Sequence, residues 1–278
     1  MPFQWKYIII NLYLFFFTYI VRSEMKYKRI VKREAHIIAC IYELIHVTAK
    51  HLNIPLHALY LGEMSKILYL AYIIEKDNLW REVIQYLINE KANPSMARLM
   101  NMIKSIEVFE WENTERELNN VMSEVCSLLN RLSNEFTNLT MKIFGFREYF
   151  NYVYVIPCFS PIPELDGNLL YWDKERAVVS ATFNPCLDIE LIVDLIHHEV
   201  LHGLVRLNNI SISHELEERI IDLLCPEGYL SELLGVSKAR IGIRDEIASY
   251  IDVYFKKRMY ENTTILEYIK KTTAREFL

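Results

Sequence analysis

The sequence predicts a mainly helical α+β protein, and three observations carry that prediction. From Met25 to about residue 146, apolar residues recur at helical spacing and glycine is nearly absent, which indicates about five helices. From Phe150 the chain changes to short β-branched and aromatic runs separated by Pro, Gly and charged residues, which indicates strands. Helical spacing returns at Asn184 or Asp188 and continues to the end. We therefore expect a helical region, residues 25–146, before a domain with a small sheet, residues 147–278.

Residues 1–24 form an apolar N-terminal segment with three open interpretations. The run YIIINLYLFFFTYIV covers residues 7–21, and counted from Trp5 it rises only about 25 Å as a helix, short of a bilayer core of roughly 30 Å. A short membrane anchor, a buried core helix and an upstream extension of a chain that starts at Met25 are the three alternatives. As an anchor, residues 5–21 would associate with the membrane, and the basic residues that follow would keep the next domain on the cytoplasmic side.

The composition is that of a globular protein from a reducing compartment. Hydrophobic residues make up 52% of the chain, enough for a sizeable core, and the net charge of -5 argues against nucleic acid as a partner. The five cysteines lie far apart without a CxxC pair, which favours free thiols and a cytoplasmic location. A basic cluster is interpreted as a solvated helix face; it comprises Lys26, Lys28, Arg29, Lys32 and Arg33.

The helical region contains two breaks and one long helix. One break is at Leu52–Pro55, and the other is at Asn93, where Pro94 suits the first position of a new helix because its missing N–H is not needed there. The stretch Asn113–Met141 has leucine and valine along one side, which predicts a long amphipathic helix that faces the core.

Three runs then predict strands: YVYVIP at 152–157, NLLYW at 168–172 and AVVSATF at 177–183. The last two are separated by charged residues from Asp173 to Arg176, so we expect them to form a hairpin.

The next helix, DIELIVDLIHHEVLHGLVRL at 188–207, is apolar on nearly every side and is therefore expected to be buried. His198 and His202 are four residues apart, so their imidazoles lie on one face and can converge on a metal ion. Glu199 is rotated by about 100° from His198, where its carboxylate can reach a water bound to that ion. The pattern predicts metal-assisted hydrolysis, with the histidines as ligands and Glu199 as the general base.

The sequence HEVLH on a buried helix, after the strand AVVSATF, resembles the HExxH zinc metallopeptidases of the zincin group. The resemblance implies a zincin-like catalytic domain with one zinc ion per chain and a peptide or protein as substrate. In that group the strand before the active-site helix lies at the edge of the sheet and binds the substrate as an additional strand. The resemblance implies that Val178–Phe183 have this role here.

In the gluzincin branch of the group a third ligand, a glutamate, comes from the next helix. Here that helix reads SHELEERIIDLL from Ser213. Glu218 is the preferred ligand, because ERIID repeats the gluzincin arrangement of a ligand glutamate with an aspartate four residues later. By that resemblance Asp222 accepts the free N–H of a ligand histidine.

Glu217 is the alternative third ligand, since it shares a helix face with Ile220 and Leu224 and can point inward; Glu215 and His214 follow. Asp194, one turn before His198, is an alternative partner for a ligand histidine or a capping residue. Several residues are chemically able to stabilise a tetrahedral oxyanion, and the sequence does not choose among them: His214, Tyr229, Arg240, Arg244, Tyr250 and Tyr254.

Two other classes of function compete with a zinc hydrolase. One is a catalytically inactive zincin-like module that binds metal or a protein partner; Glu199 argues against it, because a purely structural site does not need that glutamate. The other is a helical protein in which the motif is a coincidence and both histidines are satisfied core residues.

Overall fold

The computed structural model describes residues 24–46, 64–89, 94–108, 111–159, 167–183, 187–237, 246–259, 261 and 263–276. The N-terminal run at residues 7–21, the predicted break at 52–55 and the predicted cap at residue 93 lie outside them. The helices are α2 (Arg33–His46), α3 (Met64–Lys76), α4 (Trp80–Asn89), α5 (Pro94–Lys104), α6 (Trp111–Phe144), α7 (Ile189–Leu207), α8 (His214–Leu224), α9 (Tyr229–Leu233), α10 (Glu246–Val253), continued by a π-helical turn at Tyr254–Arg258, and α11 (Ile265–Glu276).

Four strands form a mixed sheet in the order β1-β2-β4-β3. They are β1 (Lys26–Arg29), β2 (Tyr152–Phe159), β3 (Gly167–Trp172) and β4 (Arg176–Phe183). β1, β2 and β4 are parallel, and β3 returns antiparallel to β4. The three predicted strands and their hairpin are confirmed, as is the mainly helical α+β class.

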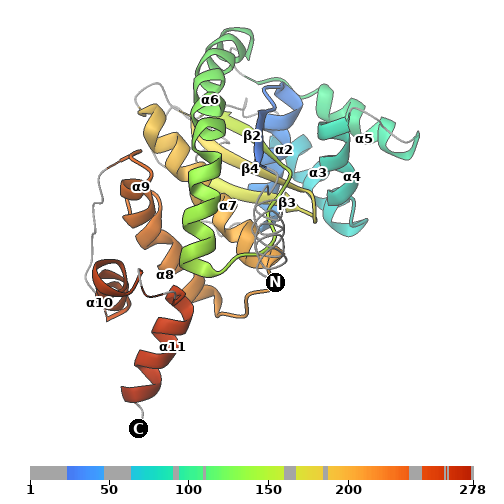
Figure 1. Cartoon of the computed structure of the whole chain (residues 1–278). Coiled ribbons are helices and arrows are strands. Elements are labelled where there is room, and N and C mark those ends of the chain that lie inside the picture. Colours follow the sequence, from blue (N-terminus) through green and yellow to red (C-terminus); the bar gives the residue numbers. More distant parts are fainter. Residues whose placement is uncertain are drawn as a thin grey trace, which may run out of the picture.

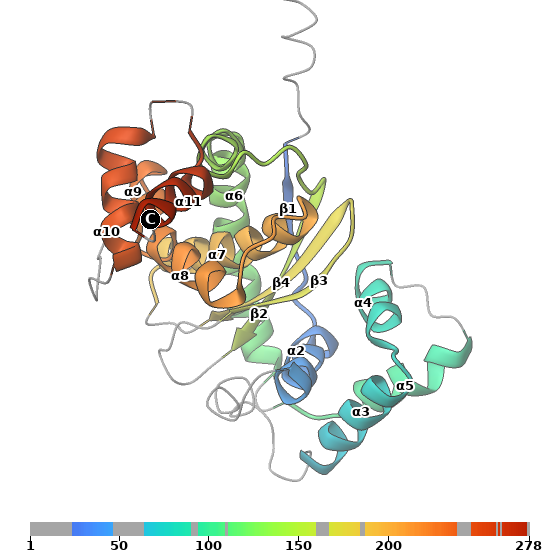
Figure 2. The same cartoon turned by 90° about the horizontal axis from the view of Figure 1, so that it is seen from below.

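Helices cover both faces of this sheet (Figures 1 and 2). On one face, α6 and α7 pack with the C-terminal helices into a core that includes Val153, Val179 and Phe183. On the other face, α2 to α5 form a second core against Ile156 and Val178. Alternate residues of β2 and β4 therefore point into different cores, which explains why both strands read as nearly continuous apolar runs.

β1 corrects the helical prediction at its start. Lys26–Arg29 pair with Tyr152–Val155 in the sheet, so the basic residues there lie on a strand instead of a helix face. Only Tyr27 of the four is buried, at 3% exposed, and Lys28 lies 4.1 Å above the ring of Tyr152. The sequence does not indicate this strand, because a run of four residues with one buried side chain shows no alternation of apolar and polar residues.

The outer edge of β1 is covered by α6. The side-chain amide of Asn130 binds both backbone groups of Tyr27: its Oδ1 accepts from the N–H at 2.8 Å and its Nδ2 donates to the carbonyl at 3.1 Å. Ser133 Oγ also donates to the carbonyl of Met25 at 2.9 Å. These contacts satisfy backbone groups that an unprotected edge strand leaves available to another chain.

The position of β4 overturns the expectation that Val178–Phe183 form an edge strand. β4 lies between β2 and β3, and the edge beside it is β3. Two carbonyls of β3 already accept side-chain hydrogen bonds from the second helical layer. Tyr42 Oη donates to Leu169 O at 3.1 Å, and Trp80 Nε1 donates to Leu170 O at 2.6 Å.

Helix α7 begins where the sequence predicts, directly after Asp188 at its N-cap. It lies against the sheet and α6, and most of its residues are buried. His197, the residue before the metal-binding pair, is directed into the core on α6. It is fully buried, stacks on Phe136 with ring centroids 4.4 Å apart, and neither ring nitrogen has a hydrogen-bond partner in the described part of the chain.

Among the described residues, none of the helices has the length and apolar character needed to cross a bilayer. Residues 5–21 lie outside the described residues, so membrane association through them stays a prediction.

The Asn130 contact predicts a measurable loss of stability on truncation. We expect Asn130→Ala to lower the free energy of unfolding by about 1–3 kcal/mol, because two backbone groups of Tyr27 lose their partner. Urea unfolding followed by circular dichroism measures it. Asn119→Ala is the matched control on the same helix. Among the described residues its amide bonds the local Glu115 carbonyl alone, so the change should alter stability by no more than about 0.5 kcal/mol. Equal losses in both variants would contradict the role of Asn130.

The buried His197 predicts a pH dependence of stability. Burial lowers the pKa of His197 from its usual 6.5 to about 3, so the unfolded chain binds more protons between these two values. The free energy of unfolding is therefore unaffected by His197 above about pH 6.5. Below that pH it falls by up to about 1.4 kcal/mol per pH unit, because the unfolded chain takes up a proton that the folded chain does not. His197→Leu should remove that slope from urea unfolding curves measured between pH 6.5 and 4.5. An unchanged slope would assign the titration to other groups.

Candidate metal centre

Helix α7 brings the two histidines of the motif together. His198 and His202 are one turn apart on the buried helix, and their Nε2 atoms are 3.2 Å from each other. Their side chains are 12% and 6% exposed. Both nitrogens therefore point at one small volume near the protein surface, as the spacing predicts.

Helix α8 supplies the third group. The Oε2 atom of Glu218 is 3.5 Å from His202 Nε2, and one ligand atom from each of His198, His202 and Glu218 lies within 4.8 Å of the others. In the part of the chain that the structure describes, this is the group of three such side chains that could hold a metal ion. Ser213 caps α8 by accepting from the N–H of Leu216, which fixes where the helix starts.

The two donor–donor distances at His202 Nε2 suit a tetrahedral divalent ion. Bonds of about 2.0–2.1 Å at tetrahedral angles separate neighbouring ligand atoms by roughly 3.3 Å, close to the 3.2 and 3.5 Å distances to His202 Nε2. An acceptor oxygen lies beside Nδ1 of each imidazole, so a neutral imidazole keeps its proton there. Once His202 has lost its second proton, each Nε2 can present a lone pair to an ion. Two imidazoles and one carboxylate are a zinc-type donor set with a fourth position left for another ligand.

The acceptor for His198 differs from the prediction. His198 Nδ1 donates to the backbone carbonyl of Cys225 at 2.7 Å, whereas Asp222 Oδ1 is 3.9 Å from the same nitrogen. Asp222 is therefore too distant for a hydrogen bond, and the carbonyl that ends α8 takes the place that the resemblance gave to Asp222. A main-chain acceptor leaves no signature in side-chain identities, so the sequence could not reveal it.

Glu217 holds the other histidine. Its Oε1 accepts from His202 Nδ1 at 2.6 Å, and the Glu217 side chain is 11% exposed. The inward direction that made Glu217 an alternative ligand is correct, but its carboxylate lies on the far side of the imidazole from Nε2. Adjacent glutamates thus contact opposite nitrogens of His202, Glu217 at Nδ1 and Glu218 at Nε2.

The electrostatics of the centre favour positive charge. Burial alone would lower the pKa of His202, but hydrogen bonds to Glu217 and Glu218 outweigh it and raise the pKa to about 9. The pKa of His198 is lowered, first by burial and then by the charge of His202. The hydrogen bond with His202 lowers the pKa of Glu218. The carboxylates therefore bind a proton on His202 tightly, and a divalent cation has the same attraction.

Glu199 lies beside the histidine pair without facing it directly. Its Oε1 is 4.0 Å from His198 Nε2, and the side chain is 9% exposed. The backbone of β3 comes close on the other side: a Cβ added at Gly167 would be 3.1 Å from Glu199 Cγ and 3.2 Å from its Oε1. The first residue of β3 is thus in contact with the predicted general base, which the sequence did not indicate.

The structure separates the oxyanion candidates. Tyr254 is buried and donates to Thr263 O, Tyr229 is hydrogen-bonded to Asp252, and Tyr250 donates to Glu246 at 2.7 Å. His214 is exposed, and its Nδ1 is 3.5 Å from Glu218 Oε1. Of these four, His214 is in contact with a metal-binding side chain; Arg240 and Arg244 lie outside the described residues.

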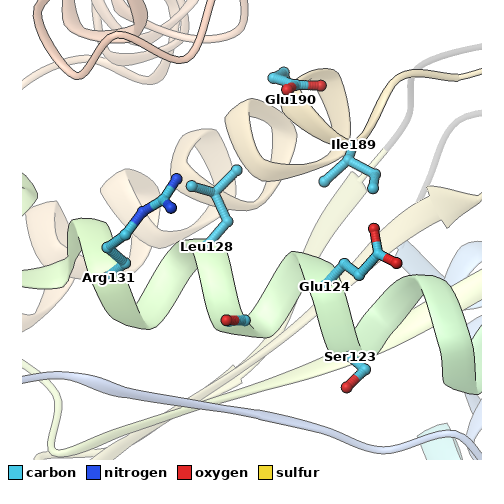
Figure 3. A pocket seen from close by; sticks show the side chains of 7 residues that line it. Ser123, Glu124, Leu128, Arg131, Ile189 and Glu190 are labelled. Carbon is cyan, nitrogen blue, oxygen red and sulfur yellow. The ribbon is translucent and has the colours of Figure 1, made fainter.

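Two hollows lie on this half of the molecule. One, of about 640 Å³, is bordered by Glu218 and Asp222 of α8 and by Ile247 of α10, so it opens beside the centre. The other, of about 430 Å³, lies between α6 and the start of α7. Figure 3 shows Glu124, Leu128 and Arg131 of α6 pointing toward α7, with Glu124 below Ile189. Its lining includes none of the metal-binding side chains, so of the two hollows the one beside Glu218 borders the centre.

Comparison of the chain with protein-family models, with curated proteins and with solved structures finds no match. The case for a metal centre therefore depends on the residues and their geometry.

The geometry predicts how each ligand contributes to metal affinity. We expect the purified protein to bind one zinc ion per chain, and His198→Ala or His202→Ala to abolish tight binding, because too few ligands remain. Glu218→Gln should weaken binding more than Glu217→Gln, which replaces the charged acceptor of the His202 Nδ1 proton by a weaker neutral one and should cost about 10-fold. Competition with a chromophoric chelator measures all four dissociation constants. If Glu217→Gln is the more damaging change, the two glutamates exchange roles.

Proposed function

We propose that the protein is a zinc-dependent hydrolase, most specifically a metallopeptidase, in which His198, His202 and Glu218 hold the ion. The observation that carries the proposal is the convergence of these three donors beside a buried glutamate, Glu199. A bound zinc ion would act as a Lewis acid toward the substrate carbonyl and lower the pKa of a water molecule toward neutrality.

Glu199 is the proposed general base and then the general acid. Its carboxylate is held between His198 Nε2 and the backbone at Gly167, so it lies beside the ligands without replacing any of them. From there it can accept a proton from the attacking water and return it to the leaving amine. A site that only stores or structures a metal has no need of such a carboxylate, which supports an enzyme over an inactive binding module.

The Gly167 end of β3 is the proposed place for the substrate main chain. β3 is the edge strand next to the centre, and edge strands bind peptides through backbone hydrogen bonds. Farther along β3, the carbonyls of Leu169 and Leu170 accept from Tyr42 and Trp80. A peptide would therefore approach β3 near Gly167, where the strand contacts Glu199.

The proposal predicts that chemistry and metal binding can be separated. Glu199→Gln should keep the fold and the zinc, while hydrolysis falls by roughly 10²–10⁴, because the amide has the same shape but cannot accept the proton. A fluorogenic peptide library measures the rate, and chelator competition on the same samples measures the metal. The acidic limb of the pH–rate profile should disappear together with the activity.

Three outcomes decide between the candidate functions. Hydrolysis at the parent rate by Glu199→Gln would exclude Glu199 as the base. Zinc binding without hydrolysis by either protein would favour an inactive metal-binding or interaction module. If the parent protein binds no zinc, the HEVLH motif occurs by chance and its histidines are ordinary core residues.

A further inference from the structure

Asp194 is a buried carboxylate on α7 to which the proposed chemistry assigns no role. Its residue is 0% exposed, and burial raises the pKa of its carboxyl group. A carboxylate inside a core is costly unless hydrogen bonds compensate for the lost water. An apolar residue would suit the surrounding core better, so the contacts of Asp194 indicate what the carboxylate stabilises.

Those contacts all reach the segment after α8. Asp194 Oδ2 accepts from the backbone N–H of Glu227 at 3.2 Å and from Ser237 Oγ at 2.6 Å. Glu227 has a φ of +52°, a left-handed conformation that is unfavourable for any residue other than glycine. The turn is also tight, since a Cβ at Gly228 would lie 2.4 Å from Leu223 O. Asp194 therefore stabilises a turn that the local sequence does not favour.

The same turn begins with the acceptor of His198. Cys225, two residues before Glu227, accepts from His198 Nδ1 through its carbonyl and donates its own N–H to Ile221 at 2.8 Å, which ends α8. Asp194 and His198 are one helical turn apart, so they project from the same side of α7. Two hydrogen bonds from this face, one from each residue, hold the Cys225–Glu227 turn against the helix.

We infer that Asp194 is a positioning residue of the metal centre: by binding the turn at Glu227, it places the Cys225 carbonyl that keeps the proton of His198 on Nδ1 and its Nε2 directed at the ion. The same turn ends α8, the helix that carries Glu218. Asp194 thus aligns α8, which carries Glu218, with α7, which carries His198 and His202. The inference uses the proposed function only in assigning Nε2 to a metal.

The test compares Asp194→Ala with the matched control Ser237→Ala, which removes another hydrogen-bond partner of Asp194 without touching the backbone N–H of Glu227. Two quantities are measured for each full-length variant. One is the ¹⁵N–¹H correlation of the His198 imidazole in metal-free protein, which reports the tautomer. The other is the zinc dissociation constant from chelator competition, measured well below the melting temperature of each variant.

We expect the parent and Ser237→Ala to show a protonated Nδ1 on His198 and zinc dissociation constants within about twofold of each other. Asp194→Ala should lose that tautomer preference and bind zinc about 10-fold more weakly, the low end of the effect of residues behind metal ligands. Asp194→Asn, which keeps a weaker neutral acceptor, should lie between them. It also serves as the test if Asp194→Ala does not fold.

A purely structural role gives a different result. In that case the melting temperature falls in the Asp194 variants while the His198 tautomer and the zinc dissociation constant stay at their parent values, and the inference is overturned. A parent protein that binds no zinc contradicts the proposed function alone, because the tautomer measurement in metal-free protein still tests the role of Asp194.

Discussion

The burial of α7 is the constraint on which the rest of this structure depends. The helix lies against the sheet and α6, and most of its residues have little contact with solvent. Polar groups in such a place must find partners inside the protein or destabilise it. Asp194 Oδ2, His198 and His202 find them in the segment that follows, at Glu227, Cys225 and Glu217. Asp194 Oδ1 and the ring nitrogens of His197 have none among the described residues. The polar face of α7 thereby determines where α8 and its C-terminal turn lie.

The features that the sequence predicted are those that depend on local periodicity. The strands at 152–157, 168–172 and 177–183 and the start of α7 at Asp188 follow from alternation, turn residues and an apolar run. The convergence of His198 and His202 follows from the helical period alone. The approach of Glu218 was reached by resemblance, and the distances agree with it.

The features that the sequence missed depend on tertiary placement. β1 is a strand because its partner, β2, lies beside it after more than a hundred intervening residues. The interior position of β4 depends on the hairpin partner β3 taking the edge. Glu217 and Glu218 are adjacent, so their side chains point about 100° apart around the axis of α8. Which carboxylate meets which nitrogen of His202 depends on how α8 packs against α7.

The covering of both sheet edges has a consequence for how this centre can meet a peptide. Asn130 binds both backbone groups of Tyr27 on β1, while Tyr42 and Trp80 bind carbonyls in the middle of β3. An exposed sheet edge can pair with a strand of another chain, which leads to aggregation. These side chains occupy backbone groups of β1 and β3 that such pairing would use. In the proposed function, the Gly167 end of β3, beside Glu199, is where recognition of a main chain and proton transfer would coincide. The helical layer of α2 and α4 would then restrict a bound peptide to a short segment next to the proposed general base.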